Sequence, residues 1–94
     1  GWLRAARAQK ALGWTARMGL DGSRHVMVIM DSPGFVASGT AHHPLGRVPA
    51  MPLVFAVQAD GSLRSTARLP EGRWQLRIAI HRDGRVMRLA ETMP

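Results

Sequence analysis

The sequence predicts an all-β fold: an antiparallel β-sandwich of about seven strands, immunoglobulin-like, preceded by one short N-terminal helix. Apolar and polar residues alternate with a period of two along most of the 94-residue chain. Residues that favour turns recur about every 8 to 12 positions, which is typical of sandwiches and barrels. Such short connections exclude the helical crossovers of a parallel sheet. A chain of this length forms a single, two-layered domain.

The first residues carry a different pattern. Residues 2–12 are rich in alanine and arginine and contain no helix breaker, and their apolar positions lie three and four apart. They predict a helix that ends at Gly13. We therefore divide the chain into an N-terminal helix, residues 1–13, and a β-sandwich domain, residues 14–94. Because the sequence begins inside this helix, we expect it to be part of a longer protein.

The strands follow in order. In the last hairpin, Trp74, Leu76 and Ile78 share one side of a strand while arginines share the other, and Asp83-Gly84 supplies a two-residue turn. A glycine within the third strand suggests a bulge or a close contact. The alternating segments are 14–20, 25–30, 35–41, 53–57, 63–69 and the two arms of the hairpin within 72–91.

The segment from His42 to Pro52 is the longest irregular stretch, and its three prolines exclude a helix or an internal strand. His42, His43 and Met51 flank it, and imidazole with thioether is a ligand set that selects Cu(I). We take these three as candidate metal ligands. The same loop is the candidate partner-binding surface, formed by His42, His43, Pro44, Arg47 and Met51. Buried methionines that fill the core are the competing interpretation of the methionine content.

The net charge of the chain does not decide which class of partner it binds. Thirteen Lys and Arg residues face six Asp and Glu residues, a formal charge of +7. This excess suits nucleic acid, an anionic lipid or an acidic partner, and equally a solvated surface. Trp14, Trp74 and Phe55 fall on the apolar side of their strands, so no rings are expected beside the arginines to stack on bases. The pattern favours arginines on the solvated face of a sheet and no nucleic-acid partner.

Other features narrow the function. The chain has no cysteine, no stretch near the roughly 20 apolar residues that span a bilayer, and no nucleophile elbow, phosphate loop or HExxH pair. We expect a soluble, non-enzymatic domain without a required cofactor. Copper is the metal that its histidine and methionine side chains suit, and another metal is the alternative. We place Trp14 and Trp74 in the core.

Two stretches resemble the FixH family: ARAQKALGW, residues 6–14, and LPEGRWQLRIAIHRDGRVMRLAE, residues 69–91, with a His-Pro step between them. The order and separation of the LGW and GRW elements are distinctive, and the resemblance covers nearly the whole chain. One departure is Leu45-Gly46-Arg47, which stands where the family often has acidic residues.

The resemblance implies an inner-membrane protein with one N-terminal transmembrane helix and a periplasmic β-sandwich. It implies a part in assembling the cbb-type haem–copper oxidase, in the setting of nitrogen fixation. Partners would be a copper-transporting P-type ATPase and an iron–sulfur membrane protein. The expected function is therefore an accessory factor that acts through protein–protein contacts near the copper-delivery machinery. The alternatives are a periplasmic copper-binding chaperone and a basic nucleic-acid-binding β-barrel.

Overall fold

The computed structural model describes residues 3–6, 13–46 and 48–93, and all regular structure within these ranges is β-strand. The predicted all-β fold is confirmed. The strands are β1 (Leu3–Ala6), β2 (Ala16–Leu20), β3 (His25–Met30), β4 (Val36–His42), β5 (Met51–Val57), β6 (Leu63–Arg68), β7 (Trp74–Arg82) and β8 (Arg85–Met93).

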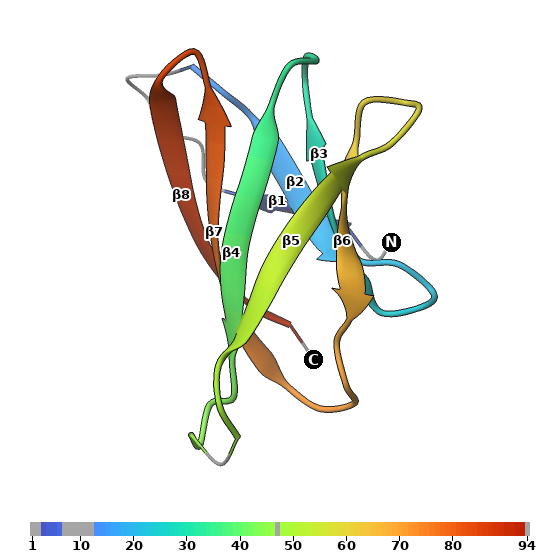
Figure 1. Ribbon diagram of the computed structural model, residues 1–94, viewed down its shortest axis with the longest axis vertical. Coiled ribbons are helices and arrows are strands. Elements are labelled where there is room, and N and C mark those ends of the chain that lie inside the picture. The colour runs from blue at the N-terminus through green and yellow to red at the C-terminus, as the bar shows by residue number, and fades with distance from the viewer. Residues whose placement is uncertain (1–2, 7–12, 47, 94) are drawn as a thin grey trace.

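The described strands form one antiparallel sheet in the order β1-β2-β3-β6-β5-β4-β7-β8, which folds over on itself (Figure 1). Strands β2, β3 and β6 make one layer, and β4, β7 and β8 make the other. The chain crosses between layers from β3 to β4 and from β6 to β7. With β2 in the place of the first immunoglobulin strand, this is the strand order of an immunoglobulin-like sandwich.

Strand β5 joins the two layers. Its first half pairs with β4, where Pro52 lies opposite Thr40, and its second half pairs with β6, where Phe55 lies opposite Ser65. In Figure 1 it runs obliquely from the lower end of β4 towards β6. The prediction that prolines keep residues up to Pro52 out of a strand is wrong at this point. Along its first half β5 has one partner and an open second edge, where the missing N–H of proline costs no ladder hydrogen bond.

The N-terminal helix prediction is wrong at Leu3–Ala6. These residues form β1 and pair antiparallel with β2, from Leu3 opposite Gly19 to Ala6 opposite Ala16. A short helix gains little from its own hydrogen bonds, whereas a strand here satisfies the backbone groups on the open edge of β2. The remainder of the predicted helix, residues 2 and 7–12, lies outside the described residues. The division at residue 13 and the upstream membrane anchor stay predictions.

The core lies between the layers, and both tryptophans belong to it as predicted, with Trp14 6% and Trp74 4% exposed. Trp14 packs edge-on against Phe35 with ring centroids 4.9 Å apart. The indole N–H of Trp74 donates to the carbonyl of Pro70 at 2.9 Å, which satisfies its one buried polar group. The other buried apolar residues are Ala16, Met18, Val26, Val28, Ala41, Leu53, Leu63, Leu69, Leu76, Ile78, Ile80, Met87, Leu89 and Met93.

The last hairpin has the predicted turn. Asp83 and Gly84 have φ angles of 52° and 75°, so both central residues adopt the left-handed conformation of a type I′ turn. The turn fixes the register of β7 and β8, in which Arg77 lies opposite Ala90 and Ala79 opposite Arg88. The register thus places these four residues on the same face of the sheet.

Candidate functional site

The candidate metal ligands lie at the end of the sandwich where β4 leads into the loop before β5. His42 is the last residue of β4, and its Nε2 is 2.7 Å from the hydroxyl oxygen of Thr40. Thr40 and His42 alternate with the buried Ala41, so both face away from the core. His42 therefore lies on the outer side of its layer.

His43 turns the other way. Its ring packs edge-on against the buried Trp74, with centroids 5.8 Å apart, and its Nδ1 accepts a hydrogen bond from the N–H of Leu45 at 3.2 Å. Met51 lies opposite Ala41 and packs partly buried against the core, so it too is on the inner side. The structure brings His43 and Met51 to one side of the layer and His42 to the other.

Of the remaining predicted partner-binding residues, Pro44 is exposed and Arg47 lies outside the described residues. Exposed apolar side chains follow in this loop, Leu45 at 70% and Val48 at 45%. Among the described residues, no group of three or more His, Asp or Glu side chains is placed to hold a metal ion. The assignment of His42, His43 and Met51 as copper ligands stays a prediction.

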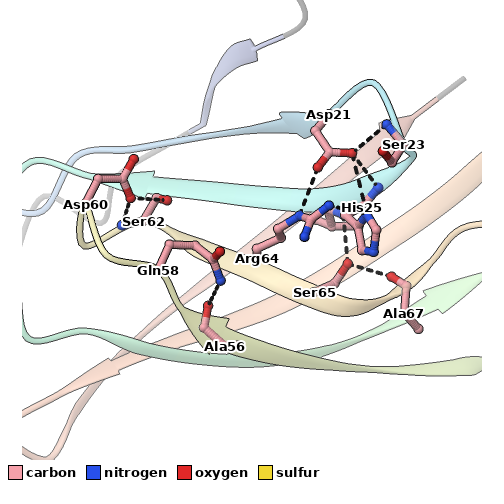
Figure 2. A network of polar contacts seen from close by, with 11 residues as sticks. Asp21, Ser23, His25, Ala56, Gln58, Asp60, Ser62, Arg64, Ser65 and Ala67 are labelled. Carbon is pink, nitrogen blue, oxygen red and sulfur yellow. Dashed lines mark hydrogen bonds and ion pairs between the residues drawn. The ribbon is translucent and has the colours of Figure 1, made fainter.

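Arginines at the β2–β3 end of the molecule are bound to other protein groups. The Nε–H of Arg64 donates to Asp21 Oδ2 at 3.0 Å, and its guanidinium also donates to His25 Nδ1 at 2.9 Å (Figure 2). Partial burial raises the pKa of Asp21, but hydrogen bonds from the N–H of His25, from Arg64 and from the N–H of Ser23 lower it, and the net pKa is below 3.8. Arg64 thus ties β6 to the β2–β3 turn.

Two further arginines anchor turns. The guanidinium of Arg24 donates to the carbonyls of Leu69 and Pro70, both at 3.0 Å, and so holds the β6–β7 connection. Arg82 donates to Ser32 at 2.9 Å and lies 4.2 Å from the ring centroid of Phe35, a cation–π contact. These arginines act in the fold.

Arg77 and Arg88 are placed differently. Both are exposed on what we call the outer face, the side of β4, β7 and β8 that points away from the core. Neither forms a hydrogen bond or ion pair with any described residue. The register makes them diagonal neighbours, about 7 Å apart at the backbone. Like charges on neighbouring side chains repel each other, so this pair does not stabilise the domain.

Between them lies the outer groove, a hollow of about 530 Å³. Its floor consists of small residues, and its side-chain lining consists of Ser38, Thr40, Arg77, Ala79, Arg88 and Ala90. The strand pairings place no Asp or Glu among the outward-facing residues of these three strands. The carboxylate nearest in sequence, Glu91, lies opposite Leu76 on the inner side. The outer groove is therefore cationic, and acidic side chains of the same face do not neutralise it.

Gly39 lies beneath this groove, with its Cβ position turned to the inner side, opposite Ile78. A Cβ at this position would lie 2.4 Å from the carbonyl oxygen of Arg77 and 3.1 Å from the Cα of Ile78. Only glycine therefore lets β4 approach β7 this closely. The sequence prediction of a close contact at this glycine is confirmed.

Sequence reasoning missed the outer groove. Arg77 and Ala79 on one strand, with Arg88 and Ala90 on the next, are a visible signal of arginines alternating with small residues. That signal has meaning only in the register of β7 and β8, which sets each arginine opposite an alanine. A shift of one residue would have moved one arginine of the pair to the inner side.

Comparison with known proteins gives one positive result. No curated protein and no solved structure matches the chain. In the part of the chain that the structure describes, no helix has the length and apolar character needed to cross a membrane. The FixH family model matches residues 1–94, the whole chain, and the chain therefore belongs to the FixH family.

Proposed function

We propose that this domain is a non-enzymatic accessory factor in the assembly of a cbb-type haem–copper oxidase, and that it works by binding a protein partner on its outer face. Membership of the FixH family links the chain to oxidase and nitrogen-fixation assembly, and the family is one of accessory proteins. The outer face supports the mode of action that we propose, which is recognition of a partner by a sheet surface.

The observation that carries this proposal is that Arg77 and Arg88 are diagonal neighbours beside one hollow, on strands whose outward-facing residues include no Asp or Glu. Charged side chains that contribute to a fold are tied to partners, as Arg24, Arg64 and Arg82 are. Two adjacent, unpaired arginines beside a groove of small residues stabilise nothing within the described chain. Surfaces of this kind, rich in arginine and partly apolar, are typical of protein interfaces.

The partners we propose are membrane proteins of oxidase assembly, among them a copper-transporting P-type ATPase and an iron–sulfur membrane protein. The domain would stand in the periplasm at the end of a membrane anchor. The loop after β4, with its exposed Leu45 and Val48, would add an apolar contact at one end of the sandwich. These assignments rest on the family, and the outer face supports the binding role itself.

The test is complementation in cells. A strain that lacks the gene receives the full-length protein, either unchanged or with Arg77→Gln and Arg88→Gln together, and the level of assembled cbb-type oxidase is measured by its haem content and oxygen consumption. We expect the double variant to accumulate normally and to lose most of the assembled oxidase. The matched control is Arg17→Gln with Arg68→Gln, which removes the same charge from exposed positions on the other layer. Full assembly with the outer-face variant would contradict the proposal.

A copper-binding function is the second candidate, favoured by the placement of His43 and Met51 on one side of the layer. Copper binding by His43 would cost one hydrogen bond that the structure contains. Because His43 Nδ1 accepts from the N–H of Leu45, the proton of the neutral ring is on Nε2. Metal binding through Nε2 of a neutral ring requires this proton to move to Nδ1. A protonated Nδ1 cannot accept the hydrogen bond from Leu45, so that bond would be lost.

An anaerobic Cu(I) competition titration tests this second candidate. If the copper function is correct, His43→Ala with Met51→Ala abolishes one-to-one binding, whereas His42→Ala, on the opposite side, leaves it intact. Absence of binding tighter than about micromolar in the unchanged protein would end the copper interpretation.

A further inference from the structure

We infer that the outer groove binds an extended segment of a protein partner whose side chains carry carboxylates, and that Arg77 and Arg88 each hold one of them. The inference rests on the proposed function and names the chemistry of the partner at that site.

Charge complementarity gives the sign of the ligand. Arg77 and Arg88 are unpaired among the described residues, and no carboxylate shares their face. A guanidinium presents donors in a planar fork that matches the two oxygens of a carboxylate. A carboxylate placed between the two arginines would also remove their mutual repulsion. The outer groove is therefore a site for an anion that neither the described strands nor their turns supply.

The lining argues for a peptide rather than a bare anion. Ala79 and Ala90 contribute apolar floor, while the hydroxyls of Ser38 and Thr40 stand along the β4 side. Beyond the groove on the same face, Val36 and Val54 are 57% and 61% exposed, and Val54 lies directly opposite Ser38. A free phosphate would bind the arginines and leave the apolar surface exposed to water. A peptide with acidic and apolar side chains uses both.

The geometry also favours an extended peptide over a lipid surface. The hollow forms because small residues separate the two arginines. A hollow between two arginines can take side chains of an extended segment, whereas a membrane surface is flat on this scale. Alternate side chains of an extended segment point the same way, so acidic residues two apart can reach Arg77 and Arg88 in turn.

The experiment is a calorimetric titration of the 94-residue chain with a synthetic peptide in which glutamates and valines occupy every second position and serines the positions between, so that both kinds of side chain face the same way, at low salt and again at about 0.15 M salt. The comparison peptide replaces every glutamate by glutamine. We expect the glutamate peptide to bind and the glutamine peptide to bind at least about tenfold more weakly. Arg77→Gln with Arg88→Gln should weaken binding by at least about tenfold, and Arg17→Gln with Arg68→Gln by no more than about twofold. Urea unfolding of each variant establishes that it is folded.

Three results would overturn the inference. One is absence of binding by the unchanged chain at low salt. Another is equal weakening by both double variants, which would make the attraction a property of net charge alone. The third is binding to phosphatidylglycerol vesicles that depends on Arg77 and Arg88 when the peptide does not bind, which would make the groove a lipid-headgroup site.

The cellular complementation separates this inference from the proposed function. Oxidase assembly that fails in the Arg77 and Arg88 variant, together with no peptide binding, would keep the assembly role and reject the acidic segment. Peptide binding that depends on both arginines, together with normal assembly in the variant, would keep the groove chemistry and reject the assembly role.

Discussion

Two regions of this sandwich use arginine in opposite ways, the turns beside β2, β3 and β6 and the outer face of β4, β7 and β8. On the layer of β2, β3 and β6, Arg24 and Arg64 donate to carbonyls and to a carboxylate and so tie turns together. On the layer of β4, β7 and β8, Arg77 and Arg88 stand unpaired beside a groove. An excess of arginine in the composition therefore does not identify a binding surface. Only the contacts in the structure distinguish arginines that stabilise the fold from arginines that are available to bind a partner. The +7 charge of the chain contains both kinds.

The largest effect is expected at Gly39, where β4 packs closely against β7. Gly39→Ala places a methyl group against the backbone of Arg77 and Ile78, which forces β4 and β7 apart, and we expect a loss of about 2–3 kcal/mol in the free energy of unfolding. Urea denaturation measures it. Gly22→Ala is the matched control, because no atom lies within 4 Å of its Cβ position. Equal stability of the two variants would show that β4 and β7 are not closely packed at Gly39.

The next largest effect is expected from replacing a buried serine on one layer, compared with an exposed serine on the other. Ser65 is 2% exposed; its oxygen accepts from the N–H of Val26 at 2.8 Å, and its hydroxyl donates to Ala67 (Figure 2). Ser65→Ala leaves a buried N–H without a partner and should cost about 2 kcal/mol. Ser38→Ala, on the exposed outer face, should change the unfolding free energy by less than about 0.5 kcal/mol. A cost at Ser38 as large as that at Ser65 would contradict this account.

Acid provides a smaller effect, which we expect at the contact between Asp21 and Arg64. The pKa of Asp21 is below its ordinary value of 3.8 in the folded protein. A carboxyl with a depressed folded pKa stabilises the protein above its unfolded pKa, and this stabilisation is lost as the pH falls through the folded value. Because the pair with Arg64 is partly exposed, we expect about 1 kcal/mol. Asp21→Asn should make the loss of stability below about pH 4 correspondingly shallower. An unchanged acid profile in that variant would remove the Asp21–Arg64 pair from the stability of the fold.

Much of the fold could be predicted from the sequence because its signals are local. The alternation of Trp74, Leu76 and Ile78, and the Asp83-Gly84 turn, depend on neighbouring residues alone, and both predictions are confirmed. The helix expected over residues 2–12 was wrong at Leu3–Ala6 because helix propensity is a weak preference that pairing with the edge of β2 overrides. The decisive contact is between strands, where propensity carries no information.

The candidate site was less predictable for the same reason. Sequence proximity suggested that His42, His43 and Met51 converge, but adjacent residues of an extended chain face opposite ways, and His42 lies across the layer from the other two. Arg77 and Arg88 become neighbours only when the register of β7 and β8 is known. An arginine that only faces solvent and an arginine that binds a partner have the same sequence pattern.

The most direct test of the division between structural and available arginines is one pair of double variants in urea unfolding. Methionine retains the length of arginine without its charge or donors. We expect Arg24→Met with Arg64→Met to lose about 2 kcal/mol, because carbonyls and Asp21 lose their donors, and Arg77→Met with Arg88→Met to stay within about 0.5 kcal/mol of the parent. Equal losses in the two variants would mean that the outer-face arginines belong to the fold, and would contradict the account.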